Sequence, residues 1–350
     1  MLLIALLGFA SRVHASPCER LTQLKRGHVS IVAAEIVVAG GFSMPGGTQH
    51  APEFFTAFGR LRPFCRVQAV ARPTRDSEIG IEVWLPASGW NGRYLGVGNG
   101  SYGGSFNYYR LGEALNVGYA ASSTDTGHRG TPRDTGWAVG HRDKQIDFDY
   151  RAVHETAETA KALIRAFYGA GPRWSYFSSC SNGGRQGLME AERYPADYDG
   201  VFVGAPALLL GFTTRVTGRF DAFAKRGGKI IIYHGANDAP APSLAFFDDV
   251  SHKLGDARVS SFLQLYVVPG MEHCGSGPGP NDIGQWLRPN ADRQHSLFKG
   301  LESWVEVGRP PTGVIATRFV RDGDAASDVA GTRVLCPYRR DSSTIQGCVP

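Results

Sequence analysis

The chain contains the stretch WSYFSSCSNG at residues 174–183, and this stretch decides its fold. Residues 174–178 have the composition of a β-strand, and the run from Arg185 to Tyr194 resembles a helix. A strand, a sharp turn that carries a serine, and a helix form the layout of a nucleophile elbow. Ser181 takes the position of the nucleophile, with Gly183 two residues later, while Ser179 stands where the usual pattern has glycine. Small residues on both sides of the serine let the strand and the helix approach closely.

The remaining chain alternates between strand-like and helix-like segments. Continuous apolar runs at residues 229–233 and 263–268 are typical of central parallel strands, and residues 147–168 have apolar positions at helical spacing. Such alternation predicts an α/β fold with a mostly parallel sheet flanked by helices. Pro and Gly mark turns but form no linker, so we expect residues 16–350 to be one domain with an N-terminal extension and a cysteine-bearing C-terminal tail.

Two further strand ends carry residues that could activate a serine. Asp238 follows the apolar run 229–233, and His273 follows the run 263–268. A serine needs a base to remove its proton, and the base needs an acid to orient it. The order Ser181, Asp238, His273 is the order that α/β hydrolases use, so we predict this catalytic triad.

Each member of the triad has an alternative interpretation. Ser181 could be an ordinary turn or helix-capping serine, and Asp248 or Asp249 could replace Asp238 as the acid. His273 could be structural. We interpret His234, which ends a strand beside the acid loop, as a packed and hydrogen-bonded histidine.

An oxyanion hole requires two backbone N–H groups. One is expected from Asn182, the residue after the nucleophile. The other is expected from the glycine-rich run at residues 98–101, where we favour the Gly100 amide, with Ser101 as the neighbouring candidate. The alternative is that this run is a plain glycine turn.

Composition and the first residues favour export and exclude some classes of partner. Residues 1–15 contain a short apolar run with small residues at its end, as in a signal peptide, although the usual positive start is missing. The run is too short to span a membrane, and no other stretch approaches that length. Lys and Arg are scattered through a chain of net charge +5, which argues against nucleic-acid binding.

The six cysteines fit an exported chain, in which an even number suggests disulfides. Cys180 precedes Ser181 and Cys274 follows His273, so a catalytic contact between serine and histidine would bring the two cysteines within disulfide reach. Six buried thiols are the alternative. We reject Cys180 as the nucleophile because Ser181 holds the elbow position. No C-x-x-C spacing is present, and we expect no metal site.

Together these residues resemble the tannase and feruloyl esterase family, which also contains a mono(2-hydroxyethyl) terephthalate hydrolase. The resemblance extends over most of residues 16–350 and rests on four stretches: residues 96–100, 180–187, 226–238 and 273–274. It implies a secreted serine esterase of α/β-hydrolase fold acting on esters of aromatic acids. It also implies the disulfides Cys180–Cys274, Cys18–Cys65 and Cys336–Cys348.

The chain departs from the family in two places. The family carries a large lid after the strand that ends here at Gly204, whereas only the twelve residues Leu208 to Arg219 stand at that point. The lid of the family holds a calcium site and much of the pocket for the aromatic acid, so we expect neither here and no cofactor. In addition, Ala236 stands where the family usually has Trp.

Three hypotheses follow from this combination. The first is hydrolysis of small esters of hydroxycinnamic, gallic or related acids. The second is a lidless hydrolase of bulky or polymeric esters. The third is a catalytically degenerate binding protein of the same fold. The sequence leaves the acyl group, the alcohol and the oligomeric state open.

Overall fold

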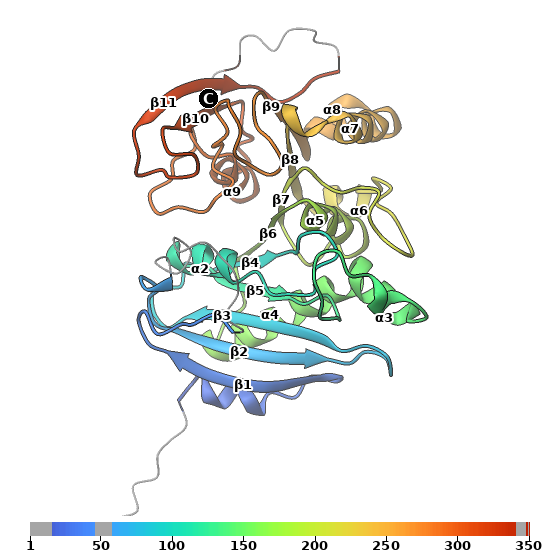
Figure 1. Ribbon diagram of the computed structural model, residues 1–350, viewed down its shortest axis with the longest axis vertical. Coiled ribbons are helices and arrows are strands. Elements are labelled where there is room, and N and C mark those ends of the chain that lie inside the picture. Colours follow the sequence, from blue (N-terminus) through green and yellow to red (C-terminus); the bar gives the residue numbers. More distant parts are fainter. Residues whose placement is uncertain (1–15, 46–57, 341–347, 349) are drawn as a thin grey trace, which may run out of the picture.

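A computed structural model describes residues 16–45, 58–340, 348 and 350 (Figure 1). In this part of the chain, nine strands form one sheet in the order β1-β2-β3-β5-β4-β6-β7-β8-β9. The strands are listed here by their bounds: β1 Val29–Val37, β2 Phe64–Ala71, β3 Ile79–Pro86, β4 Arg93–Val97, β5 Ala120–Thr124, β6 Trp174–Cys180, β7 Gly200–Gly204, β8 Lys229–Gly235 and β9 Leu263–Val268. Strands β5, β4, β6, β7, β8 and β9 are parallel, and β1 to β3 extend the sheet in antiparallel fashion.

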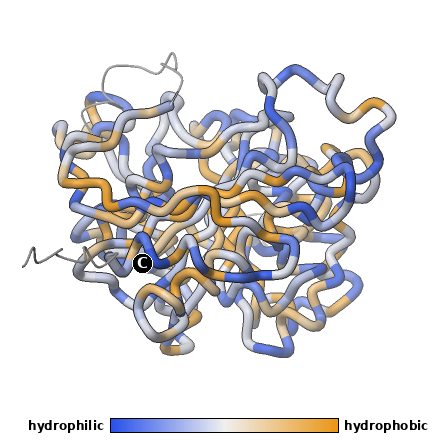
Figure 2. Tube along the Cα trace, turned by 90° about the horizontal axis from the view of Figure 1, so that it is seen from below, coloured by the Kyte–Doolittle hydropathy of each residue, from blue (hydrophilic) through white to orange (hydrophobic). Residues whose placement is uncertain are grey.

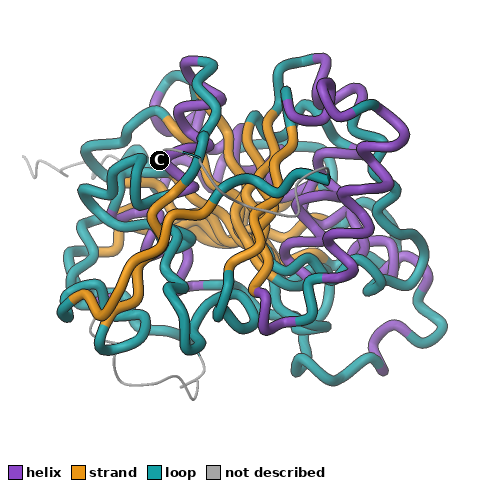
Figure 3. The backbone as a smooth tube through the Cα atoms, turned by 90° about the horizontal axis from the view of Figure 1, so that it is seen from above, coloured by secondary structure: helices purple, strands orange, loops and turns teal. Residues whose placement is uncertain are grey.

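Helices cover both faces of this sheet (Figure 3). On one face lie α2, Tyr108–Asn116, and α9, Leu297–Val307. On the other lie α4, Ala152–Tyr168, α5, Asn182–Arg193, and α7, Ala241–Leu254. Shorter elements complete the described chain: η1 Glu19–Gln23, η2 Gly136–Ala138, α3 Arg142–Ile146, a π-helical turn η3 Asp147–Arg151, α6 Asp221–Lys225, η4 Ala236–Asp238 and α8 Asp256–Ser260.

Successive side chains of the central strands belong alternately to two separate hydrophobic cores. In β8, Ile230 and Ile232 point to the core beneath α4, α5 and α7, whereas Ile231 points to the core beneath α2 and α9. This alternation follows from the two-residue period of a strand. Both faces are buried, which explains why the parallel strands are continuous apolar runs. Figure 2 shows these apolar segments in the interior and hydrophilic segments in the outer loops.

The ends of the described chain pack onto the sheet. The expected N-terminal extension contributes β1 to the main sheet, where it pairs with β2. The Cys18–Cys65 disulfide also joins the residue before η1 to β2. After α9, the hairpin β10–β11, Val314–Phe319 and Val329–Leu335, forms a second small sheet. Tyr338 N–H then donates to the Leu265 carbonyl of β9 at 2.6 Å.

Local hydrogen bonds and a π-helical turn set the ends of two helices. Helix α9 begins at Leu297, because the Ser296 side chain accepts a hydrogen bond from the Lys299 N–H and caps it there. The predicted helix 147–168 is divided into the π-helical turn η3 and α4. The predicted signal peptide, residues 1–15, lies outside the described residues. None of the described helices is long and apolar enough to cross a bilayer.

Candidate active site

Ser181 stands at the turn between β6 and α5 in a backbone conformation that L-residues rarely adopt. Its φ is 63° and its ψ is −125°. The end of β7 holds it there: Ser181 N–H donates to the Gly204 carbonyl at 2.9 Å, and the Ser181 carbonyl accepts from Ala207 N–H at 3.0 Å. Such strained positions persist only where neighbouring structure fixes them, and they gather at functional sites. The geometry is that of a nucleophile elbow.

Glycines allow α5 to start close to the sheet. A Cβ on Gly184 would lie 2.7 Å from the Gly204 carbonyl oxygen and 3.0 Å from Pro206 Cα, and these backbone atoms cannot move aside. A Cβ on Gly183 would collide with the Ser179 side chain. Ser179, which replaces the glycine of the usual pattern, therefore fits because Gly183 has no side chain.

The acid and base loops meet at the ends of β8 and β9. His273 Nδ1 lies 2.6 Å from Asp238 Oδ2, so the Nδ1–H of the imidazole donates to the carboxylate. Asn237 N–H donates to the Met271 carbonyl at 3.0 Å. A side chain on Gly235 would clash with the Met271 and Glu272 carbonyls, so this approach of the two loops requires glycine. The alternative acids, Asp248 and Asp249, lie along α7, and Asp249 pairs with Lys253 instead.

A disulfide joins the elbow to the base loop. Cys180 and Cys274 are bonded, with their Cα atoms 5.8 Å apart, and the Tyr233 hydroxyl donates to the Cys274 carbonyl at 3.2 Å. The other two bridges are Cys18–Cys65 and Cys336–Cys348. All six cysteines lie in the described residues, and none of them is free.

Ser181 and His273 line the same cavity, which has a volume of about 890 Å³. The described residues show no hydrogen bond between the two side chains, and catalytic hydrogen bonds are often loose before substrate binds. The His273 side chain is 54% exposed, so the imidazole faces solvent. Six Phe, Tyr and Trp residues line the cavity: Phe58, Phe106, Tyr108, Tyr109, Tyr233 and Trp286.

Of the two residues expected to stabilise an oxyanion, Gly100 lines this cavity, and Asn182 directly follows the cavity-lining Ser181. Asn182 is the first residue of α5, where backbone N–H groups lack a partner within the helix. Gly100 lines the cavity, and a Cβ there would meet nothing within 4 Å. The loop is fixed to α5 next to Gly100, because Asn99 N–H donates to Gln186 Oε1 at 3.0 Å.

Two buried groups in and near the cavity have shifted pKa values. Burial raises the pKa of Asp125, which lines the cavity, to about 6, although its carboxylate accepts hydrogen bonds from the N–H groups of Gly127 and Gly80. Burial lowers the pKa of His234, whose Nε2 lies 3.3 Å from Asp238 Oδ2. The contact between His234 and Asp238 was not predicted from the sequence. The four-residue spacing of the two side chains across one tight turn could have indicated it.

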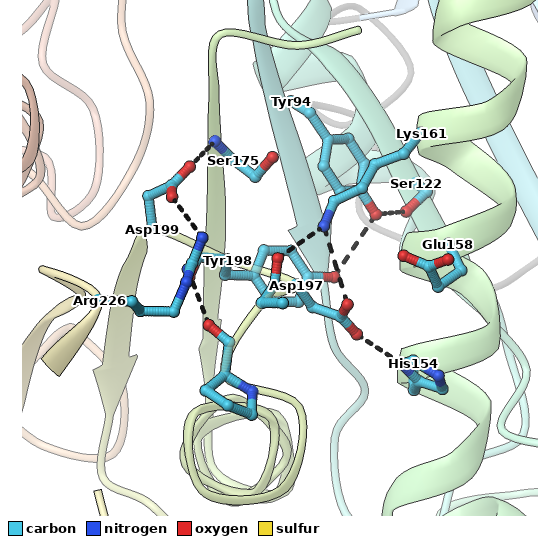
Figure 4. Close-up of polar contacts among 12 residues, drawn as sticks. Tyr94, Ser122, His154, Glu158, Lys161, Ser175, Asp197, Tyr198, Asp199 and Arg226 are labelled. Atoms are coloured by element: carbon cyan, nitrogen blue, oxygen red, sulfur yellow. Dashed lines mark hydrogen bonds and ion pairs between the residues drawn. The ribbon is translucent and has the colours of Figure 1, made fainter. Parts of the chain in front are cut away.

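Among the residues that the structure describes, two clusters of side chains bring together atoms that could ligate a metal. In the first, Cys180, His273 and Cys274 lie close, but both sulfurs belong to a disulfide and are not thiolates. The second contains His154, Glu190 and Asp197. Figure 4 shows that His154 and Lys161 both point at Asp197; the distances are 2.6 Å and 3.8 Å. These two partners engage the Asp197 carboxylate of the second cluster.

The segment between β7 and α6, residues 205–220, is short and firmly attached. The fully buried Asp149 carboxylate accepts hydrogen bonds from Phe212 N–H at 3.0 Å and from Thr213 N–H at 2.5 Å. The buried Arg185 guanidinium lies 4.0 Å from the same carboxylate. The Phe212 ring packs against Tyr102, on the same loop as Gly100, with ring centroids 5.6 Å apart.

Comparison with known proteins identifies the family. The family described as tannase and feruloyl esterase matches residues 65–220 and 212–345. The chain belongs to this family. It is therefore an enzyme of the carboxylesterase type, and the predicted family and fold class are confirmed. The two matched stretches meet at residues 212–220, inside the short segment between β7 and α6.

An esterase of Xanthomonas campestris is 42% identical to this family member over 514 alignment positions, which cover 93% of this chain and 88% of the relative. Because this chain has only 350 residues, the relative carries long stretches with no counterpart here. A probable feruloyl esterase B-1 of Aspergillus terreus is 36% identical, over 59% of this chain and 39% of that enzyme.

Solved structures show the same fold. Feruloyl esterase B from Aspergillus oryzae superposes with a TM-score of 0.81 at 20% identity. The superposition covers 95% of the present chain and 99% of the Aspergillus enzyme. A tannin acyl hydrolase from Aspergillus niger has a TM-score of 0.64 at 17% identity, with 92% of both chains covered.

Proposed function

We propose that this chain is a secreted serine esterase that hydrolyses esters of aromatic carboxylic acids through Ser181, His273 and Asp238. One observation carries the proposal: His273 Nδ1 lies 2.6 Å from Asp238 Oδ2, and the same imidazole shares a cavity with Ser181 at the elbow. The order and roles of the three residues are those of a Ser-His-Asp triad.

In the proposed reaction, Ser181 Oγ attacks the ester carbonyl while His273 Nε2 accepts the hydroxyl proton. Asp238 orients the imidazole and stabilises the imidazolium, and the N–H groups of Asn182 and Gly100 stabilise the oxyanion. His273 then gives the proton to the departing alcohol, leaving an acyl-enzyme. Water, deprotonated by His273, attacks the acyl carbonyl, the bond from the acyl carbon to Ser181 Oγ breaks, and His273 returns the proton to Oγ as the carboxylic acid leaves.

Aromatic acyl groups are supported by the cavity wall and by the relatives. Aromatic side chains such as Tyr108 and Trp286 offer faces against which a planar acid can pack. The named relatives include feruloyl esterases and a tannin acyl hydrolase. We therefore propose hydroxycinnamic, gallic or related acids as the acyl group.

The decisive experiment compares the wild type with Ser181→Ala on methyl ferulate and p-nitrophenyl acetate. The variant should lose turnover of both esters, and a fluorophosphonate probe should label the wild type only. Retained turnover in a clean preparation of the variant would contradict the assignment of Ser181 as the nucleophile. Absence of both labelling and turnover in the wild type would favour the binding-protein hypothesis.

The reaction as proposed uses only groups of the chain itself, so we propose that it needs no cofactor. Prolonged dialysis against a chelator should leave turnover of methyl ferulate unchanged. A loss that calcium restores would contradict this part of the proposal.

A second candidate is hydrolysis of bulky or polymeric esters. Two observations favour it: the segment 205–220 is short, and the His273 side chain is 54% exposed. Rates on soluble monoesters and on a suspended aromatic polyester distinguish the candidates. Release of acid from the polymer at a rate comparable with the monoester would support the second.

A further inference from the structure

His234 is a second histidine, besides His273, that contacts the proposed triad acid Asp238. It lies near the end of β8, is only 5% exposed, and makes polar contacts through both ring nitrogens, two at Nε2 and one at Nδ1. Its Nε2 lies 3.1 Å from the Asp238 carbonyl oxygen and 3.3 Å from Asp238 Oδ2. Its Nδ1 lies 2.8 Å from the hydroxyl of Ser243, a fully buried residue of α7.

These partners determine where the proton of His234 resides. A carbonyl oxygen only accepts hydrogen bonds, so Nε2 must carry the hydrogen that is directed at Asp238. In the neutral ring Nδ1 then accepts from the Ser243 hydroxyl. Burial lowers the pKa of His234, and the neighbouring His273 lowers it further, whereas Asp238 raises it. The net direction is downward, which favours the neutral ring with hydrogen on Nε2.

Asp238 needs such support because of its place in the chain. It is the last residue of the one-turn helix η4, and Ala239 after it has a φ of 50°. Its side chain is 24% exposed, so water competes for the carboxylate. Oδ2, the oxygen that meets His273 Nδ1, is also the one near His234 Nε2.

We infer that His234 is a positioning residue for the triad: its Nε2–H holds the main chain of Asp238 so that Oδ2 meets His273 Nδ1. The inference rests on the proposed function, since it assigns a role within the same site. His234 does not touch the reacting atoms and acts only through Asp238. Its loss should lower kcat and leave KM unchanged, because alignment of acid and base matters in the transition state.

Two amide variants separate this role from mere packing. In His234→Gln, the side-chain NH2 reaches the position of Nε2 and can still donate to Asp238. In His234→Asn, the shorter amide reaches only the position of Nδ1, beside Ser243. The variants bury similar polar groups, so they differ mainly in whether a donor meets Asp238.

We expect His234→Gln to keep kcat on methyl ferulate within about threefold of wild type, and His234→Asn to lose about tenfold or more with KM unchanged. The rate of labelling of Ser181 by a fluorophosphonate should fall in parallel. His154→Gln is the matched control: it removes an imidazole that is bonded to the Asp197 carboxylate outside the cavity, and it should leave kcat unchanged.

Equal kcat for the Gln and Asn variants, whether high or low, would overturn the positioning role. So would a rise in KM that accounts for the whole loss in the Asn variant. A wild type that neither hydrolyses the ester nor reacts with the probe would instead overturn the proposed function. If His234→Asn fails to fold, Ser243→Ala replaces it: loss of the hydroxyl frees the ring to change tautomer, and kcat should fall while KM stays unchanged. An unchanged kcat would then count against the role.

Discussion

Cys180 and Cys274 are joined by a disulfide although 94 positions separate them in the sequence. Each is the immediate neighbour of a proposed catalytic residue, Ser181 or His273. The bridge therefore ties the backbone beside the proposed nucleophile to the backbone beside the proposed base. Displacements of about 1 Å in such a pair can cost about a hundredfold in rate.

Replacing both Cys180 and Cys274 by Ala should lower the free energy of unfolding by about 3–5 kcal/mol, since the bridge closes a long loop. It should also lower kcat by at least about tenfold. Urea unfolding and turnover of methyl ferulate measure the two effects. The matched pair Cys336→Ala and Cys348→Ala opens a loop of only 12 positions, so it should destabilise less and leave kcat unchanged. Equal kcat for both double variants would show that the first bridge serves stability alone.

Asp149→Asn should destabilise the protein by about 3–5 kcal/mol, because it leaves the buried Arg185 guanidinium without its counter-charge. The amide also cannot accept all the hydrogen bonds from residues 212 and 213 that the carboxylate accepts. Chemical denaturation measures the loss. Asp249→Asn breaks an exposed pair with Lys253 and should change stability by less than about 1 kcal/mol. Similar small effects at both sites would show that the segment 205–220 is not held through Asp149.

Asp125→Asn should make the protein more stable at pH 7 and have little effect at pH 4. The pKa of Asp125 is about 6 in the folded state against 3.8 as the ordinary value. Below pH 3.8 the Asp125 carboxyl is protonated in both the folded and the unfolded state, so its contribution to the free energy of unfolding is fully present. This contribution is lost as the pH rises through 6, because the folded state binds the proton more tightly than the unfolded state. The lost contribution reaches about 3 kcal/mol. Asn can still accept from Gly80 and Gly127 through Oδ1, which receives both bonds.

Thermal unfolding of the wild type and Asp125→Asn across pH 4 to 8 tests this prediction. Asp134→Asn is the control, because Asp134 accepts from Gly136 N–H in an exposed turn and should show no such trend. A stability difference between wild type and Asp125→Asn that does not vary with pH would contradict the raised pKa.

Trp286→Ala should raise KM for methyl ferulate by about tenfold, equivalent to the roughly 1.4 kcal/mol of an aromatic contact. KM for an aliphatic ester such as ethyl butyrate should change little. Trp286 lines the cavity and lies under the Arg110 guanidinium at 5.2 Å. Trp90→Ala removes a tryptophan that stacks on Tyr168 outside the cavity and should alter neither constant. An equal effect on both esters would show that Trp286 does not select the aromatic acid.

The sequence predicted the relative positions of Ser181, Asp238 and His273 because each follows a strand of one parallel sheet. The carboxyl ends of parallel strands share an edge, so the residues that follow β6, β8 and β9 are expected to lie together. The link between Cys180 and Cys274 followed from the same reasoning. These predictions depend on strand order and not on the details of side-chain packing.

Features that depend on tertiary contacts were missed. Strand β2 carries Arg66 and Gln68, whose polar side chains meet the buried Glu82 of β3, and its sequence alone did not suggest a strand. Helix α2 follows the glycine-rich loop, and its start depends on Asn107, which accepts from Arg110 N–H. The contact of His234 with Asp238 depends on how the acid loop turns. Propensity and spacing do not encode these choices.

The conformation of Ser181 has a consequence for evolution. A residue with φ of 63° and a β-carbon is under strain that glycine would relieve, typically by 1–3 kcal/mol. The chain would thus be more stable with glycine in place of its proposed nucleophile. Selection for stability alone would replace this serine by glycine. We therefore attribute the serine to selection for the proposed reaction, which needs its hydroxyl group.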